Sequence, residues 1–190
     1  MAEKEFEIGG INHLALVCSD MRRTVDFYSN VLGMPLIKTV ELPDGTGQHF
    51  FFDCGGGNAL AFFWFPGAPA KVPGVTHPGA MPGFGDIASA VASMNHVALQ
   101  IPVDKFHEYR QKLKAKGVQV GVVLFHDDSP STIATKMHPG VYVGSLYFFD
   151  PDGILLEFAA WTRPLTADDV RHEPAAPAVG TAPVETVAKA

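Results

Sequence analysis

The chain is poor in cysteine and has neither a long apolar run nor a run of basic residues. Cys18 and Cys54 are its only cysteines, so no disulfide framework is expected, as is usual in a reducing compartment. No apolar run reaches the roughly 18 residues that a membrane helix needs, and residues 1–5 lack the apolar centre of a signal peptide. With a formal net charge of −6, the chain also lacks the basic stripe that nucleic-acid binding requires. We therefore expect a cytoplasmic protein without nucleic-acid or membrane partners.

What the sequence does contain is an internal repeat. The run Asn-His-Leu-Ala-Leu at residues 12–16 returns as Asn-His-Val-Ala-Leu at residues 95–99. Further on, Phe-Phe-Asp at residues 51–53 matches residues 148–150. A repeat of this kind has to be recognised first, because it decides the fold. If the two copies pack about a pseudo-two-fold axis, the two histidines can meet.

The pattern of apolar residues predicts the order β-α-β-β-β in each copy. Ser19-Asp20 offers an N-cap and Gly33 a C-cap for the first helix, and Gly117 is a candidate C-cap of the second. Turn residues separate the strands. The predicted strands are 11–18, 36–42, 49–53, 59–65, 94–101, 118–125, 141–149 and 154–161, and the second helix is 103–116.

Two segments do not follow the repeat. Residues 66–93 are rich in proline and glycine, and we interpret them as a linker or lid. Residues 162–190 are rich in alanine and proline and are interpreted as a C-terminal arm. Residues 1–10 form a polar lead-in. The predicted organisation is therefore a first βαβββ module at residues 11–65 and a second at residues 94–161.

Three residues within the apolar strands have side chains that can bind a metal. They are His13 and His96, at equivalent positions of the repeat, and Glu157, whose equivalent in the first copy is Ala61. A buried Glu is rare unless it is paired or binds a metal. Two histidines and one carboxylate are the ligand set of non-haem Fe(II) centres, which leaves open positions for a substrate and O2. The repeated position of the histidines favours a metal site over isolated, hydrogen-bonded core residues.

These residues resemble the ligands of the vicinal-oxygen-chelate superfamily, which includes glyoxalase I, methylmalonyl-CoA epimerase, fosfomycin-resistance thiol transferases, bleomycin-binding proteins and type I extradiol dioxygenases. The resemblance covers residues 11–161. It implies an α+β fold in which two paired βαβββ modules form a cupped mixed β-sheet around a metal. It also implies that His13, His96 and Glu157 are the metal ligands. Glyoxalase I has a fourth ligand where Ala61 stands, which disfavours that activity.

The second module is most similar to the type I extradiol dioxygenases. Their motif has a His, then an apolar residue and Tyr, then Asp-Pro-x-Gly and the ligand Glu. Here the motif reads His138, Leu146, Tyr147, Asp-Pro-Asp-Gly at residues 150–153, and Glu157. The resemblance implies that His138 and Tyr147 are catalytic residues that hydrogen-bond the substrate oxygens at the metal.

One position departs from the extradiol pattern. Ring-cleaving members carry a further His as acid–base catalyst where this chain has Asn58, and an asparagine cannot transfer a proton near neutral pH. His49 and His77 are alternatives, although nothing in the sequence places either of them. Five aromatic residues are candidates for pocket walls or for plain core: Phe51, Phe62, Trp64, Phe149 and Trp161.

We therefore predict a cytoplasmic non-haem Fe(II) dioxygenase, as a homodimer, that acts on a small catechol-like aromatic substrate and O2. Mn(II), Co(II) and Zn(II) are the other candidate metals. One alternative is a non-redox metal-dependent enzyme of the same fold, such as an epimerase, a glyoxalase-like lyase or a thiol transferase. Another is a metal-free protein that binds a small molecule and confers resistance, although such a protein has no need of an intact set of His, His and Glu.

Overall fold

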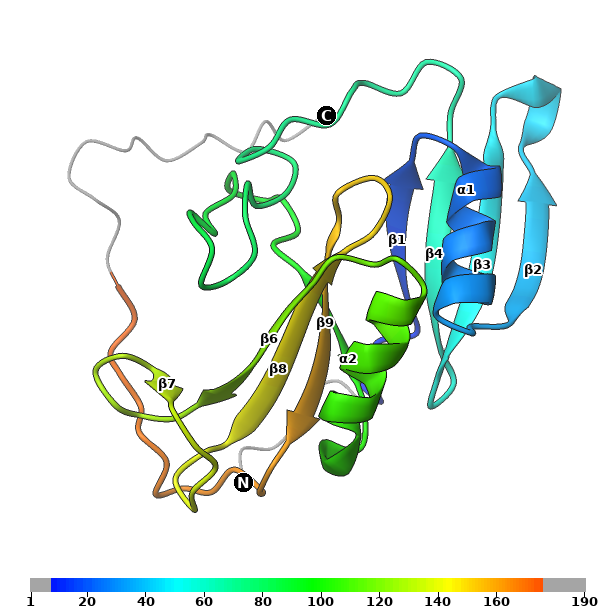
Figure 1. Ribbon diagram of the computed structural model, residues 1–190. Coiled ribbons are helices and arrows are strands. Elements are labelled where there is room, and N and C mark those ends of the chain that lie inside the picture. The colour runs from blue at the N-terminus through cyan, green and yellow to red at the C-terminus, as the bar shows by residue number, and fades with distance from the viewer. Residues whose placement is uncertain (1–7, 176–190) are drawn as a thin grey trace.

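The structure, a computed structural model, describes residues 8–175 and contains two β-sheets (Figure 1). The strands are β1 (His13–Cys18), β2 (Leu36–Glu41), β3 (Gln48–Gly55), β4 (Asn58–Trp64), β5 (Val97–Gln100), β6 (Val120–His126), β7 (Ile133–Ala134), β8 (Val143–Phe149) and β9 (Leu155–Trp161). The first sheet has the order β1-β4-β3-β2, and the second has the order β5-β9-β8-β6-β7. β1 pairs in parallel with β4, and β5 pairs in parallel with β9.

The predicted order β-α-β-β-β is present in both modules, and the α+β fold class is confirmed. The short strand β7, which pairs with β6, was not expected, because it falls in a loop with no alternating pattern. Parts of the predicted lead-in and C-terminal arm, residues 1–7 and 176–190, lie outside the described residues. Within residues 8–175, no helix is long and apolar enough to cross a membrane.

The helical segments begin and end near the predicted caps. They are α1 (Met21–Val25), the π-helical turn η1 (Asp26–Val31), the 3-10 turns η2 (Pro43–Gly45) and η3 (Val103–Lys105), and α2 (Phe106–Ala115). The Asp20 side chain accepts a hydrogen bond from the backbone N–H of Arg23 at 3.1 Å, as an N-cap does. Gly33 and Gly117 have φ angles of +79° and +78°, the left-handed conformation that glycine adopts after a helix end.

Strand register corrects one detail of the repeat. Phe51 of β3 pairs with Ala61 of β4, and Tyr147 of β8 pairs with Glu157 of β9. The structural equivalent of Phe51 is therefore Tyr147 and not Phe148, which the Phe-Phe-Asp match indicated. The two hairpin turns differ in length and the first contains a register shift, so the sequence match is one residue out of step with the sheets.

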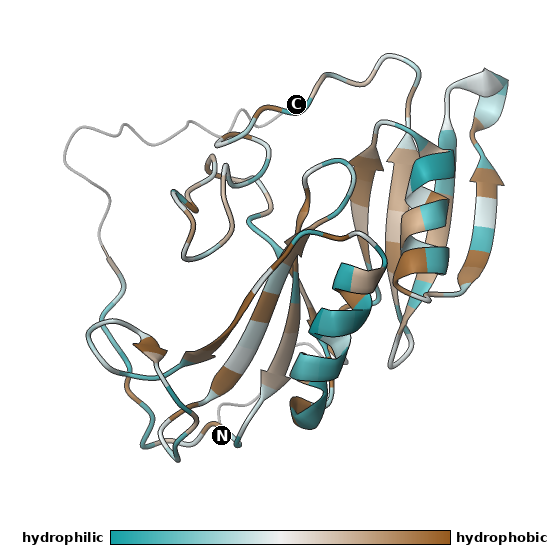
Figure 2. Cartoon of the chain, viewed as in Figure 1, coloured by the Kyte–Doolittle hydropathy of each residue, from teal (hydrophilic) through white to brown (hydrophobic). Residues whose placement is uncertain are grey.

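One hydrophobic core lies between the two modules. Leu16 and Cys18 of β1 and Leu146 and Phe148 of β8 belong to a single cluster of buried side chains. Helix α2 contributes Leu113 to the same cluster, and the visible side of this helix is mainly hydrophilic (Figure 2). Because strand side chains alternate between faces, the remaining residues of these strands point away from the shared core.

Those outward faces carry the candidate ligands. On β1, His13 and Val17 alternate with the buried Leu16 and Cys18 and are exposed. On the second sheet, the opposite face contains a separate small cluster around Tyr147. The expected single cup around a metal is therefore not formed within one chain: the two sheets are separate, and the modules pack through their helical sides.

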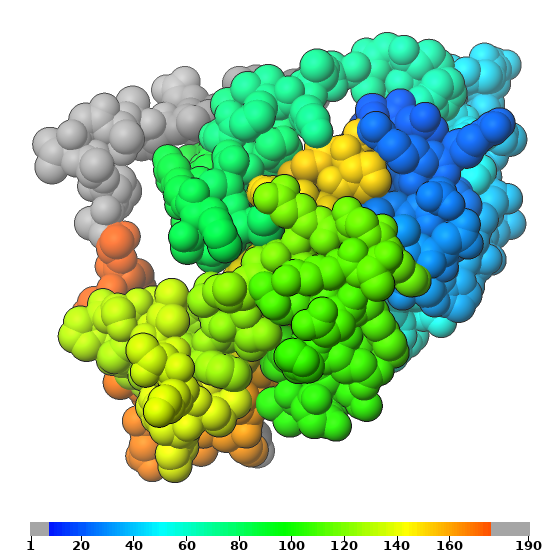
Figure 3. Space-filling view, viewed as in Figure 1, coloured from blue at the N-terminus to red at the C-terminus, as the bar shows by residue number. Residues whose placement is uncertain are grey.

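The turn between β8 and β9 holds the two modules together. Asp152 accepts hydrogen bonds from the backbone N–H and hydroxyl of Ser19, at 2.9 and 2.6 Å, and from the Arg23 guanidinium at 2.7 Å. Asp150 accepts a buried hydrogen bond from the Tyr28 hydroxyl at 3.2 Å. Figure 3 shows this turn, in yellow, lying between the blue first module and the green linker.

A second connection lies at the end of α2. The Lys116 ammonium group donates hydrogen bonds to the backbone carbonyls of Asn30 and Val31, at 2.8 and 2.6 Å. A cation at this position also satisfies carbonyls that the end of a helix leaves without an intrahelical partner. Together with the β8–β9 turn, this connection fixes the module packing from two sides.

The proline-rich linker packs over the second sheet without forming a helix or a strand of its own. Within the linker, Pro73 and His77 form an isolated β-bridge. Met81 packs against Tyr147 and Leu155, on the face that carries Glu157. The linker therefore covers part of the face on which the candidate ligands of the second module lie.

The pH dependence of stability should report on Asp150. Burial raises the pKa of Asp150 to about 6, above the value of roughly 3.9 for an unfolded chain. Between these two pH values the folded protein holds a proton on Asp150 that the unfolded chain releases. The stability that this retained proton provides is therefore complete below about pH 4 and is lost as the pH rises through about 6. The loss amounts to roughly 3 kcal/mol at most. Urea unfolding of wild type and Asp150→Asn from pH 4 to pH 7 measures it, and parallel curves would contradict the prediction.

Candidate metal centre

His96 and Glu157 form the closest pair of candidate ligands. His96 immediately precedes β5, and Ala98 of that strand is the register partner of Glu157 on β9. Residues two apart on a strand share a face, which places the imidazole over the carboxylate. His96 Nε2 lies 3.0 Å from Glu157 Oε2. Glu157 is only 5% exposed, so its carboxylate is buried with this imidazole beside it.

Asn95 sets the orientation of the His96 ring. Its amide nitrogen donates to the Ile87 carbonyl at 2.8 Å, so its oxygen accepts from His96 Nδ1, also at 2.8 Å. Nε2 and the Glu157 carboxylate are then two electron-pair donors 3.0 Å apart, which a proton or a metal cation can bridge. A ligand histidine typically has its other nitrogen held in this way. Imidazole and carboxylate donors fit Fe(II), Mn(II), Co(II) or Zn(II).

The first module contains the same Asn–His arrangement. Asn12 Oδ1 lies 2.8 Å from His13 Nδ1, which leaves His13 Nε2 as the nitrogen available to a metal. The asparagines before the two histidines had no role in the predicted metal site. Their repetition together with the histidines was the signal that could have identified them.

The structure does not bring all three candidate ligands together in one chain. His13 lies on the outward face of the first sheet, where its ring packs against Phe51 with centroids 5.6 Å apart. Among the described residues 8–175, no three His, Cys, Asp or Glu side chains are close enough to one another to hold a metal ion. His96 and Glu157 therefore lie together, and His13 lies apart from them on a separate face.

Tyr147 lies beside the His96–Glu157 pair. It is the register partner of Glu157, and its ring meets that of His96 edge-on with centroids 5.8 Å apart. Burial and the neighbouring Glu157 carboxylate raise the pKa of Tyr147 to about 12. The hydroxyl therefore keeps its proton at neutral pH and can donate a hydrogen bond to a ligand.

His138 has its own hydrogen-bond partners in the loop that precedes β8. Its Nδ1 accepts from the backbone N–H of Gly140 at 3.1 Å, so Nε2 carries the proton that is donated to Asp127 Oδ2 at 3.0 Å. The imidazole is also exposed to solvent. Both ring nitrogens thus stabilise the loop, and the structure does not group His138 with Glu157 and Tyr147.

The other candidates for acid–base chemistry lie in different surroundings. Asn58 donates hydrogen bonds to the carbonyls of Gly55 and Gly56, both at 3.1 Å, and so closes the β3–β4 turn. His77 is buried in the linker, where its Nδ1 lies 2.8 Å from the Pro78 carbonyl. His49 lies on β3, on the same outward face as Phe51 and His13.

The five candidate pocket aromatics separate into two groups. Phe62 is fully buried and Trp64 packs against the shared core, so the proposed wall position is wrong for both. They occupy the core side because they alternate with Ala61 and Phe63 along β4. Phe51, Phe149 and Trp161 lie on the opposite faces of their strands.

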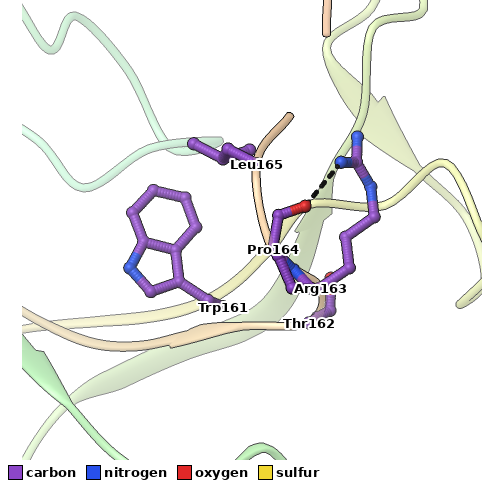
Figure 4. A pocket seen from close by; sticks show the side chains of 5 residues that line it. All are labelled: Trp161, Thr162, Arg163, Pro164 and Leu165. Carbon is purple, nitrogen blue, oxygen red and sulfur yellow. Dashed lines mark hydrogen bonds between the residues drawn. The ribbon is translucent and has the colours of Figure 1, made fainter. Parts of the chain in front are cut away.

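One surface hollow lies away from the candidate ligands. It is an open surface depression of about 580 Å³ next to the end of β9, lined by Trp161, Thr162, Arg163, Pro164 and Leu165. Figure 4 shows the Trp161 ring and the Leu165 side chain on its two sides, with Arg163 bonded to the Pro164 carbonyl. A second hollow of about 400 Å³ lies between the modules and includes Cys54. Neither hollow is lined by His13, His96 or Glu157.

Comparison with known proteins identifies the family. Residues 10–158 match the Glyoxalase/Bleomycin resistance protein/Dioxygenase superfamily. The chain belongs to this superfamily, as its repeat and its candidate ligands indicated. The match includes metal-dependent enzymes and dioxygenases in one group, so it does not single out the extradiol type.

Solved structures agree on the fold. A glyoxalase family protein from Enterococcus faecalis is 21% identical, with 81% of this chain and 99% of that chain covered and a TM-score of 0.56. The fosfomycin resistance protein FosX from Listeria monocytogenes, in complex with Mn(II) and sulfate, is 20% identical, with 82% and 94% covered and a TM-score of 0.51. At these identities, the likeness establishes the fold of the chain.

Replacing Asn95 should weaken metal binding without unfolding the protein. Asn95→Leu removes the acceptor that orients His96, and loss of such an outer partner lowers metal affinity about 10–100-fold. Asn95→Asp keeps an acceptor oxygen and should keep most of the affinity. Calorimetric titration with Mn(II) measures the effect, with Asn30→Leu, an exposed asparagine, as the matched control. Equal affinity of Asn95→Leu and wild type would contradict this role.

Proposed function

We propose that this protein is a divalent-metal enzyme whose ligands are His96 and Glu157 of one chain and His13 of a second copy. We further propose that it is an Fe(II) dioxygenase of catechol-like aromatic compounds. The observation that carries the proposal is the contact of His96 with the buried Glu157, in which Asn95 holds the other ring nitrogen. This arrangement has the donor types and the outer partner of a metal-ligating pair.

The outward direction of His13 supports a homodimer. β1 and β5 are edge strands of their sheets, and both half-sites lie at these edges. Val17 lies on the same face of β1 as His13. It is 52% exposed, which is unusual for an apolar residue in a strand. In a two-fold dimer, each contact occurs twice. Placing the first module of one copy against the second module of the other thus completes two identical sites.

The residues around the half-sites suit a small aromatic substrate. A bound divalent metal would supply Lewis acidity and a template for two neighbouring substrate oxygens. Tyr147 would donate its retained proton as a hydrogen bond to one of these oxygens. Phe51 and Phe63, on the His13 face, offer flat apolar surfaces to an aromatic ring. His138 has no part in this proposal, because both its nitrogens are engaged in its own loop.

A non-redox reaction of the same metal centre is the second candidate. It is favoured by Asn58 and His138, because neither is placed to transfer a proton in ring cleavage. Epimerisation, lyase chemistry or thiol transfer would use Mn(II), Co(II) or Zn(II) as a Lewis acid without O2. Oxygen consumption separates this candidate from the dioxygenase.

Mixing two inactive variants should restore metal sites if each site is shared. His13→Ala and Glu157→Gln each disable every site of their own homodimer. In a heterodimer, one site combines the intact His13 of one copy with the intact His96 and Glu157 of the other. Random exchange should therefore restore about a quarter of the wild-type sites, measured as bound Mn(II) after unfolding and refolding the mixture. A mixture that binds no more metal than the separate variants would contradict the shared site.

Oxygen consumption tests the reaction. Wild-type protein reconstituted anaerobically with Fe(II) should consume O2 when catechol is added. Glu157→Gln removes the charge that offsets the cation, so it should lose metal and turnover while remaining folded, because glutamine fills the same volume without a buried charge. An oxygen electrode, metal analysis and circular dichroism measure the three quantities.

The other outcomes of this experiment identify the alternatives. Turnover with Zn(II) or Mn(II) and no oxygen uptake would assign the non-redox reaction. A protein that contains no metal, and that binds a small molecule equally well as wild type and as Glu157→Gln, would assign the metal-free binding function.

A further inference from the structure

We propose that the hollow between the two modules is a binding site for a small amphipathic anion, a molecule with an apolar body and one carboxylate. This hollow is separate from the candidate metal centre, because none of His13, His96 and Glu157 lines it. The inference goes beyond the proposed function and does not depend on it.

The hollow lies at the boundary between the modules and is lined from both sides. The first module lines it with Val31, at the end of η1, and with Cys54 of β3. The second module lines it with Leu99 of β5, Tyr109 of α2 and Phe158 of β9. Its volume of about 400 Å³ is within the range of pockets that hold small molecules, and such pockets are frequent where two domains meet.

Most of the lining is apolar and only partly buried. Ile101 and Leu113 belong to the buried core shared by the two modules. The other apolar side chains pack against this core but remain partly exposed in the hollow: Val31, Leu32, Met34, Leu99, Tyr109 and Phe158. An apolar ligand that covers these side chains removes their exposed surface from water, and this burial is the main source of its affinity.

The charged residues that line the hollow are both cations, Lys112 and Lys116. The Lys116 ammonium group uses two of its three N–H groups for the carbonyls of Asn30 and Val31, at 2.8 and 2.6 Å. Within residues 8–175, no carboxylate forms an ion pair with Lys116. Its charge and its third N–H group are therefore available to an anion.

Lys112 adds positive charge on the same helix. Its ammonium group lies 2.5 Å from a Glu108 oxygen and 5.3 Å from the centre of the Tyr109 ring. Lys105 contacts the other Glu108 oxygen at 2.9 Å, so one carboxylate faces two ammonium groups. Among the described residues, none that lines the hollow is acidic. The net positive charge favours a carboxylate ligand and disfavours an amine.

Three ligands with the same apolar chain test the preference for an anion. Calorimetric titration of wild type with decanoate, below the concentration at which it forms micelles, should show one bound molecule per chain. Decanol has no charge, so it should bind about 2–5-fold more weakly. Decylamine should bind more weakly still, because its charge has the same sign as that of the two lysines.

Four variants locate the bound decanoate. Leu99→Phe enlarges a side chain that lines the hollow and should weaken binding about 10-fold or more. Leu14→Phe is its matched control, because Leu14 also packs against the core and does not line the hollow. Lys112→Gln should weaken binding about 2–5-fold. Lys114→Gln, at an exposed lysine of α2 outside the hollow, should bind as wild type.

Cys54 provides a measurement on wild type that does not depend on whether Leu99→Phe folds. It lines the hollow and is partly exposed, whereas Cys18 is only 1% exposed. Decanoate should therefore slow the reaction of Cys54 with a maleimide, and decylamine at the same concentration should not. Cys54→Ser, in which only Cys18 remains, gives the background rate.

The results that would overturn the site are distinct. Absence of decanoate binding, unchanged binding by a folded Leu99→Phe, or no protection of Cys54 would each show that the hollow is not the binding site. Equal binding of decanoate and decylamine would overturn the anionic class of the ligand. None of these results bears on the metal centre, which is tested by Mn(II) binding.

Discussion

The hydrogen bonds of the β8–β9 turn decide which faces of the two modules are available for chemistry. Asp150 is buried, and its carboxylate accepts from the Tyr28 hydroxyl and from backbone N–H groups of its own turn. Asp152 ties the same turn to Ser19 at the start of the first helix. A buried carboxylate is costly unless its hydrogen bonds are satisfied. Because this turn is satisfied only when the helical sides of the modules meet, the faces that carry the histidines are directed outward.

This packing gives each module one of the two proposed half-sites, with its own internal support. In one half-site, Asn95 orients His96 against the buried Glu157; in the other, Asn12 orients His13. The support is local, since each asparagine precedes its histidine in the chain. In the proposed dimer, the orientation of each imidazole would thus be established before the two half-sites meet, which would lower the entropy lost on association.

The sequence predicts the modules well and their mutual arrangement poorly. Alternation and caps locate nearly all strands and helices, because these depend on neighbouring residues. The face shared by His96 and Glu157 also follows from alternation. Whether His13 of the same chain joins them depends on hydrogen bonds between residues more than 100 positions apart, such as Tyr28 with Asp150, and no local pattern reports those. The partners of His138, Asp127 and Gly140, are close in sequence, but they depend on how the loop before β8 folds, which its place in a motif does not report.

A site shared between two copies links metal binding to association. A metal that binds only the dimer stabilises it by an amount that grows with the ratio of free metal to its dissociation constant. The reciprocal holds as well: association raises metal affinity by the same factor. In the proposed dimer, Phe51 extends this link to the substrate, because its ring lies beside His13, whereas Tyr147 lies beside Glu157. A substrate that contacts both side chains at once can bind only where two chains meet. Metal, substrate and partner copy would then stabilise the same assembled state, and each would raise the affinity for the other two.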